Sequence, residues 1–246
     1  MICACSRRRW LAFAAAALAG APPVALAQTR IETRSVPRFQ SLRWQASGEL
    51  LIEQTGRERV SIEAEPTLLP RIVTEVDGAT LSIRFAPGSF ETRHPVRVRV
   101  EVASLESIEA DGAGTLSVGA LKTGSLRLRL AGSESLRLLR LDARSLDARL
   151  DGAGALTVDG GQVDRQHLVI AGAADYTASQ LACREAVVSI PGAGTAWLAV
   201  NGRLEVAIEG SGDVLYLGQP QVIASLGGSG SVRRIGVDRG SGQRKP

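Results

Sequence analysis

Ile108-Glu-Ala-Asp-Gly-Ala-Gly-Thr-Leu-Ser-Val118 is the first full copy of a pattern that recurs through the second half of the chain. Its centre is the turn Asp111-Gly-Ala-Gly. Equivalent turns follow, with their first glycines 20 residues apart four times and then 18 apart twice: Ala131-Gly-Ser-Glu, Asp151-Gly-Ala-Gly, Ala171-Gly-Ala-Ala, Pro191-Gly-Ala-Gly, Glu209-Gly-Ser-Gly and Gly227-Gly-Ser-Gly. A fixed period of this length is the signature of stacked repeats.

Apolar residues alternate with mixed residues on both sides of each turn. The positions four before, two before and four after the first glycine are apolar or, once, tyrosine: Ile108, Leu128, Ala148, Leu168, Val188, Val206, Ala224; Ala110, Leu130, Leu150, Ile170, Ile190, Ile208, Leu226; Leu116, Leu136, Leu156, Tyr176, Ala196, Val214, Val232. A period of two indicates strands with one buried face rather than helices. We expect the glycines to adopt backbone angles closed to other residues and to let neighbouring turns approach closely.

This pattern predicts an all-β protein, a right-handed β-helix solenoid with coils of about 20 residues. Each strand would pair with the coils above and below it at about 4.8 Å, and equivalent apolar side chains would stack in columns. The alternative is a β-sandwich of successive hairpins, because a strand spacing of about 10 residues also suits that fold.

The remaining residues extend this organisation. Residues 31–104 have strand-like sequences without the repeat, and Asp77-Gly78 resembles a hairpin turn. We expect 31–104 to form non-repetitive strands that cap one end, because an open end of a solenoid exposes strand edges. Residues 105–235 would form the repeated coils. Residues 236–246 are polar and glycine-rich, so we expect a disordered tail.

Residues 1–27 have the pattern of a secretory signal peptide. Ser6-Arg-Arg-Arg gives a positive start, Trp10 to Gly20 an apolar stretch, and Ala25-Leu-Ala a small-residue cleavage site before Gln28. Pro22-Pro23 interrupts the apolar run, which argues against a membrane anchor. The arginines also resemble a twin-arginine signal, so both the Sec and Tat routes stay open. We expect a periplasmic or extracellular protein with no transmembrane segment after cleavage.

Removing this segment changes the charge and the cysteine count. It takes Arg7, Arg8 and Arg9 and no acidic residue, so the net charge falls from +4 to +1. A nearly neutral chain gives no support for a nucleic-acid partner. Cys3 and Cys5 leave with the segment, so Cys183 stands alone and no intramolecular disulfide can form.

Three groups of motifs resemble a known bacterial family. They are Arg38-Phe-Gln-Ser-Leu with Gly48-Glu-Leu-Leu-Ile-Glu-Gln, then Val60-Ser-Ile-Glu-Ala with Thr74-Glu-Val-Asp-Gly-Ala-Thr-Leu-Ser-Ile, and the G-x-G turns that begin at Asp111. Together they resemble the putative auto-transporter adhesin head GIN domain, a domain of unknown function, over residues 31–235. The resemblance implies a right-handed β-helix and an extracytoplasmic setting, and it brings no catalytic residues. Glu134 and Ala174 replace the second glycine of their turns, so those turns are expected to differ.

Arginines form the one notable charge cluster. Arg127, Arg129, Arg137 and Arg149 are candidate ligand-binding residues, with Arg140 and Arg144 nearby. Alternation places most of them outward, where they could bind acidic polysaccharide or lipopolysaccharide phosphate. Asp142 and Asp147 interleave with them, and this also fits a solvated, salt-bridged face.

Other candidate chemistry is weaker. Asp111 and Asp151 would lie about 9–10 Å apart, two coil rises, a separation that suits inverting glycosidases. Aspartate before glycine is also a common turn residue. The two histidines, His94 and His167, lack metal-ligand spacing and fit surface positions, and Cys183 fits the core. Calcium β-roll and phosphate-loop patterns do not match.

The sequence therefore predicts an exported cell-envelope protein with a non-catalytic, adhesin-like β-helical binding module. Its expected partner is envelope polysaccharide or another envelope protein, without a cofactor or a metal. Two alternatives remain. One is a polysaccharide-active enzyme that uses turn carboxylates such as Asp111, Asp151 or Asp213, and the other is a passive structural spacer.

Overall fold

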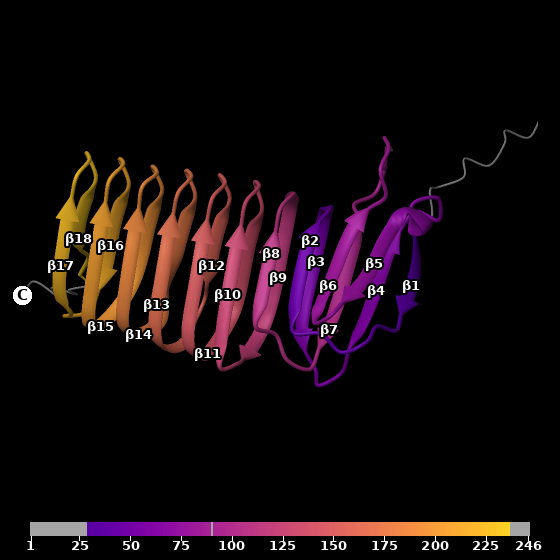
Figure 1. The fold of residues 1–246 in the computed structure, drawn as a ribbon, viewed down its shortest axis with the longest axis horizontal. Helices are drawn as coiled ribbons and strands as arrows, with labels where there is room; N and C mark the ends of the chain where they lie inside the picture. The colour runs from indigo at the N-terminus through magenta and orange to yellow at the C-terminus, as the bar shows by residue number, and fades with distance from the viewer. Residues whose placement is uncertain (1–28, 90, 237–246) are drawn as a thin grey trace, which may run out of the picture.

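The computed structural model describes residues 29–89 and 91–236, in which strands dominate (Figure 1). They are β1 (Arg30–Arg34), β2 (Ser41–Gln45), β3 (Ser47–Gln54), β4 (Arg59–Ala64), β5 (Ile72–Asp77), β6 (Thr80–Phe85), β7 (Arg97–Val102), β8 (Ser107–Ala110), β9 (Ala113–Lys122), β10 (Ser125–Leu130), β11 (Ser135–Leu150), β12 (Ala155–Val158), β13 (Gly161–Ile170), β14 (Asp175–Ile190), β15 (Thr195–Ile208), β16 (Asp213–Leu217), β17 (Gln221–Leu226) and β18 (Ser231–Arg234). One 3-10 helix, η1 (Leu69–Arg71), follows β4. Within the described ranges, no helix has the length and apolar character needed to cross a membrane. The expected signal peptide lies outside these ranges, as does the tail beyond residue 236.

From β8 onward the chain winds as a solenoid whose coils cross two facing sheets. Sheet I contains β2, β6, β8, β10, β17 and the C-terminal parts of β11, β13, β14 and β15. Sheet II contains β3, β7, β9, β12, β16, β18 and the N-terminal parts of β11, β14 and β15. Every pairing between successive coils is parallel. The predicted β-helix is confirmed, and the β-sandwich alternative is wrong because hairpin neighbours would pair antiparallel.

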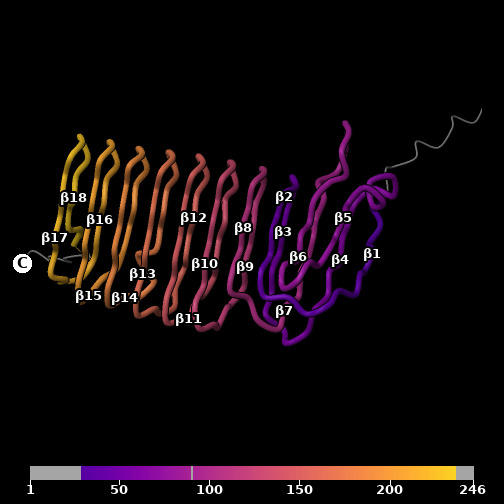
Figure 2. The backbone as a smooth tube through the Cα atoms, viewed as in Figure 1, coloured from indigo at the N-terminus to yellow at the C-terminus, as the bar shows by residue number. Residues whose placement is uncertain are grey.

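The register of these pairs reproduces the sequence period. Leu126 pairs with Leu146 and Ala148 with Leu168, each 20 residues on. Trp197 pairs with Leu215, 18 residues on, where the repeat shortens. Figure 2 shows the glycine turns aligned along one edge of the stack. The coil is therefore one repeat of the sequence.

The N-terminal strands stack in an order that differs from their order along the chain. The coil made by β2 and β3 lies between two others, pairing with β6 and β7 on one side and β8 and β9 on the other. Antiparallel strands follow beyond it, with β4 beside β7, β1 beside β4 and β5 beside β6. Gly78, with a φ of +58°, makes the expected hairpin turn between β5 and β6.

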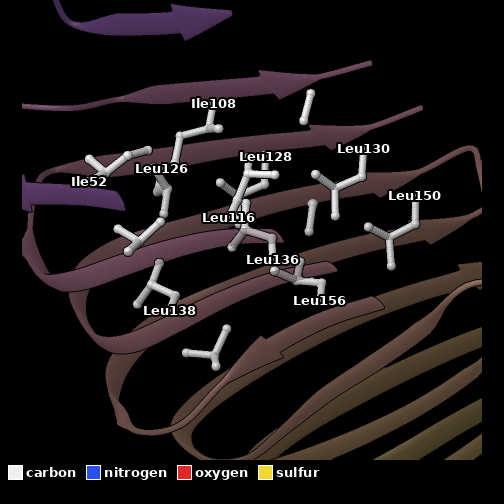
Figure 3. Packing of buried hydrophobic residues seen from close by; sticks show 14 of the residues in the cluster. Ile52, Ile108, Leu116, Leu126, Leu128, Leu130, Leu136, Leu138, Leu150 and Leu156 are labelled. Carbon is white, nitrogen blue, oxygen red and sulfur yellow. The ribbon is translucent and has the colours of Figure 1, made fainter. Parts of the chain in front are cut away.

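The core is a stack of aliphatic side chains between the two sheets. Figure 3 shows Leu116 and Leu136 of sheet II beside Leu128 and Ile108 of sheet I. All four are at most 1% exposed. Because each column repeats in every coil, hydrophobic burial accumulates along the whole length rather than at one centre.

Glycine is required at the first position of each turn because neighbouring backbones approach too closely for a side chain. A Cβ on Gly152 would overlap the carbonyl oxygen of Gly132 and lie 2.8 Å from that of Ala131. The expectation of unusual backbone angles is wrong for these first glycines, since none of them has a positive φ. Among the glycines at the second turn position in the described residues, Gly114 alone has a positive φ, of +139°.

The two turns without a second glycine use different solutions. Ala174 fits as a buried methyl group. Glu134 is fully buried, and its carboxylate accepts hydrogen bonds from the backbone N–H groups of Gly112 and Gly132. In later coils the equivalent N–H, such as that of Gly172, donates to a carbonyl of the preceding coil, that of Leu150. Glu134 thus replaces a backbone acceptor with a side-chain acceptor.

The Gly152→Ala substitution should destabilise the fold by about 3 kcal/mol or more, because the methyl group forces two coils apart. Gly160→Ala is a matched control, since its Cβ would meet only the carbonyl oxygen of Gln180 at 3.9 Å. We expect it to change stability by less than about 0.5 kcal/mol. Urea unfolding followed by circular dichroism measures both, and equal stabilities of the two variants would contradict the steric account.

Candidate functional site

The arginine cluster divides between the two sheets. Arg127 and Arg129 on β10 and Arg149 near the end of β11 point outward from sheet I. Arg137, near the start of β11, points outward from sheet II. The structure therefore gathers three of the four candidate residues on one face and places the fourth on the opposite face.

Carboxylates accompany most of these arginines. Asp151 lies 3.3 Å from Nε of Arg129 and 2.8 Å from Nε of Arg149, and Asp159 lies 2.6 Å from Nε of Arg137. The arginine side chains are more than half exposed. Such pairs contribute little to stability, about 0–1 kcal/mol each, but they lower the positive potential that would attract an anionic ligand.

Arg127 differs from its neighbours. It forms no ion pair with any residue in the described part of the chain. It lines a hollow of about 200 Å³ together with serines and two carboxylates, contributed by Ser41, Ser107, Ser125, Ser145, Glu106 and Asp147. The guanidinium and hydroxyl groups are hydrogen-bond donors suited to an acidic or hydroxylated ligand.

The turn carboxylates are poorly placed for acid catalysis. Asp151 is engaged by two arginines. Asp213 accepts hydrogen bonds from the hydroxyl and backbone N–H of Ser231, and these bonds lower its pKa. A general acid needs a raised pKa. Asp111 lines a separate small hollow with Arg43 and Arg129.

Histidines and other metal ligands are scattered over the surface. His167 is exposed, and its Nδ1 lies 3.3 Å from Asp147. His94 is exposed in the loop before β7. Among the described residues, no group of three or more His, Cys, Asp or Glu side chains could hold a metal ion.

Polar side chains inside the core form hydrogen bonds with other groups of the chain. The hydroxyl of Tyr176 donates to Oε1 of Gln166 at 2.7 Å, and both side chains are buried. The thiol of Cys183 donates to the carbonyl oxygen of Glu185 at 3.0 Å, and burial raises its pKa. A raised pKa disfavours the thiolate, so Cys183 belongs to the core rather than to reactive chemistry.

Burial raises the pKa of Tyr176 far above its ordinary value of 10, because a phenolate there would be desolvated. The unfolded chain loses this proton near pH 10 while the folded chain keeps it. The free energy of unfolding should therefore fall by about 1.4 kcal/mol per pH unit above pH 10. Urea unfolding of wild type and Tyr176→Phe on both sides of pH 10 isolates this slope. Equal pH dependence in the two proteins would contradict it.

Sheet II carries an outward tryptophan that the sequence reasoning missed. Trp197 on β15 lies between Ala196 and Leu198, both fully buried, so its side chain points away from the core. It is half-buried and is not among the partly buried residues that pack against the core. Alternation within Ala196-Trp-Leu198 was the signal that could have identified it.

The outward neighbours of Trp197 are polar, apart from Leu215. Thr177 and Leu215 pair with it on the neighbouring coils. Two residues earlier on the strand, Thr195 pairs with Asp175 on one side and Asp213 on the other. Neighbours across strands lie about 4.8 Å apart, and residues two apart along a strand about 7 Å. These outward residues of sheet II are named the Trp197 platform: Asp175, Thr177, Thr195, Trp197, Asp213 and Leu215.

A broader groove follows the bends opposite the glycine turns. It has a volume of about 640 Å³ and runs from Lys122 past β11, β13 and β14 to Asn201. Its charged residues alternate in sign, as in Asp142, Arg144 and Asp164. The groove therefore lacks the single-sign field that would attract one class of charged ligand.

Comparison with known proteins gives one family and several structures. The family model described as "Putative auto-transporter adhesin, head GIN domain" matches residues 38–220. Comparison with curated proteins finds no match.

Several solved structures share the fold. A putative adhesin from Bacteroides fragilis NCTC 9343 is 20% identical with a TM-score of 0.80, over 85% of this chain and 97% of that one. A putative adhesin from Parabacteroides distasonis ATCC 8503 is 19% identical with a TM-score of 0.69, over 85% and 98%. A protein described as a putative lipid binding protein, from the same organism, is 21% identical with a TM-score of 0.67, over 85% and 97%. At these identities the likeness shows a common fold.

Proposed function

We propose a function for this chain, which belongs to the family of the putative auto-transporter adhesin head GIN domain. The protein is an exported, non-catalytic module of the cell envelope, and it binds polysaccharide on sheet II. The observation that carries this proposal is the Trp197 platform. The family and the adhesin descriptions of its structural neighbours support an adhesin-like role in the cell envelope. The pattern of residues 1–27 supports export to the periplasm or the cell surface.

The platform combines the two contacts that a sugar ring needs. The accessible face of the half-buried indole ring of Trp197 can pack against the C–H face of a sugar, since aromatic rings provide large contact area with a polar edge. The hydroxyl of Thr195 can donate or accept hydrogen bonds, and the carboxylates of Asp175 and Asp213 accept them from sugar hydroxyls. The lowered pKa of Asp213 keeps its carboxylate ionised as an acceptor.

Rigid strands favour this kind of binding. Trp197, Thr195 and their neighbours belong to hydrogen-bonded strands with coils on both sides. Binding of a ligand therefore costs little conformational entropy in the protein, because the side chains project from a fixed backbone.

Trp197→Ala should weaken binding to the recognised polysaccharide about tenfold or more, as removal of a central aromatic anchor does at other interfaces. Val187→Ala is the matched control, because Val187 is an apolar residue, 43% exposed, on sheet I. Co-sedimentation with purified peptidoglycan and biolayer interferometry with capsular and O-antigen polysaccharides would measure both. Absence of wild-type binding to every polymer would favour the spacer alternative, and full binding by Trp197→Ala would contradict the platform.

Arg127 supports a second contact, with acidic groups of such a polymer, on sheet I. Changing Arg127, Arg129 and Arg149 together to serine should weaken binding to acidic polysaccharide or lipopolysaccharide and reduce its salt dependence. Arg59→Ser, on the antiparallel strand β4 beside β7, is the control, because it lies away from both proposed contact surfaces. Unchanged binding and salt dependence in the triple variant would refute the arginine patch. The arginines of sheet I would then form only a solvated, salt-bridged face.

A further inference from the structure

The last coil leaves the end of the solenoid bare. All six residues of β17 are exposed, although β17 continues the columns of the preceding coil. Val222 pairs with buried Leu204 and Leu226 with buried Ile208, yet Val222 is 37% and Leu226 is 52% exposed. Within the described residues, β17 pairs only with β15 and β18 only with β16. The aliphatic core therefore ends in an open cross-section with unpaired backbone groups.

The two ends of the stack differ in their protection. At the other end, antiparallel β1 and β5 form the outer strands, and they carry charged residues such as Glu32, Glu75 and Asp77 (Figure 1). Charged edge strands discourage pairing with other chains. The strand β17, Gln221-Val-Ile-Ala-Ser-Leu226, has no charged residue and no proline. By this criterion β17 is an edge open to strand addition.

Residues 237–246 are poorly suited to cover this edge. Their sequence, Val-Asp-Arg-Gly-Ser-Gly-Gln-Arg-Lys-Pro, contains one aliphatic residue and three basic ones. The neighbouring strand β18 already carries Arg233 and Arg234. A basic, glycine-rich segment would bring like charges together there and would bury little apolar surface.

We propose that a second copy of this chain docks on the bare end, with the two β17 strands pairing antiparallel across a twofold axis. Only one end of the described stack is bare, so the contact joins like ends and closes as a dimer rather than growing into a filament. Each copy satisfies the backbone groups of the other and continues its core columns.

Side-chain parity restricts the register of this pairing, and the three inward residues of β17 then select one register. Residues directly opposite each other in an antiparallel pair point to the same face. Val222, Ala224 and Leu226 point inward, whereas Ile223 points outward. Parity requires a residue of β17 to face its own copy, and only an axis midway between the two Ala224 residues pairs all three inward residues with inward residues. Val222 then faces Leu226 of the second copy, so that inward residues meet inward residues.

The dimer has a consequence for binding. A twofold axis across the bare ends joins two stacks into one longer rigid body that carries two Trp197 platforms. Two platforms on one polymer chain would raise the apparent affinity through effective concentration.

Arg233 lies on the same coil as β17, in sheet II, where the two copies would bring like charges near each other. Salt should therefore strengthen the dimer.

Light scattering after size exclusion, over a range of protein concentrations, tests the association. Wild type should be a dimer that is more stable at high salt. Ala224→Lys and Ile223→Lys should be monomers, while Val187→Lys, a charge on an interior strand of the same sheet, should remain dimeric. Circular dichroism and the melting temperature of each variant show whether the stack is intact. Because Ile223 points away from the core, we expect the Ile223→Lys variant to fold even if Ala224→Lys does not.

Cysteine cross-linking tests the register. In a chain with Cys3 and Cys5 replaced by serine, Ala224→Cys should form a disulfide-linked dimer on oxidation, because paired Cα atoms lie about 4.5–5.5 Å apart. Ser225→Cys should not, since it faces Ile223 of the second copy. A wild type that stays monomeric at every concentration, or a dimer that survives both lysine substitutions, would overturn the proposal. Neither result affects binding by the Trp197 platform of a single copy, so the two proposals fail separately.

Discussion

The structure depends on the spacing between hydrogen-bonded coils. Parallel backbone pairing sets adjacent strands about 4.8 Å apart, and the turns must follow at the same spacing. At the turn edge the backbone of Gly152 lies directly against that of Gly132, with no space for a Cβ. Glycine therefore recurs with the coil period because of close approach. The 20-residue repeat of glycine in the sequence results from this contact between successive turns.

Once the spacing is fixed, alternation assigns every side chain to the core or to the surface. Inward columns such as Leu116 and Leu136 bury aliphatic residues, and their burial accumulates coil by coil. Outward columns are free to vary, because they make no contribution to the core. Ion pairs occupy sheet I near β10 and β11 and sheet II near β3, β7 and the start of β11, whereas around β15 sheet II presents Trp197 among threonines and aspartates. The fold thus separates the residues that maintain it from those available for recognition.

A stack of parallel strands also has two ends, and the chain treats them differently. At one end it reverses direction, and the antiparallel strands β1, β4 and β5 close the stack. At the other end β17 follows the same repeat as the coils before it, without a reversal or added charge. Within the stack, the buried carboxylate of Glu134 replaces backbone hydrogen-bond acceptors at two turns.

The sequence by itself determined the fold class, the coil length and the direction of most side chains. Local periodicity was enough, because strand alternation and close turns leave a mark on every repeat. It also identified Cys183 as a core residue, since a free cysteine is a small side chain that is most often buried. It did not reveal that β2 and β3 lie between later coils, because that placement depends on pairings between segments far apart in the chain. Nor could it separate Arg137 from Arg127, Arg129 and Arg149, or show which arginines share Asp151. Those facts follow from the bend within β11, which sends its two halves to opposite sheets, and only the tertiary structure decides where a continuous strand turns.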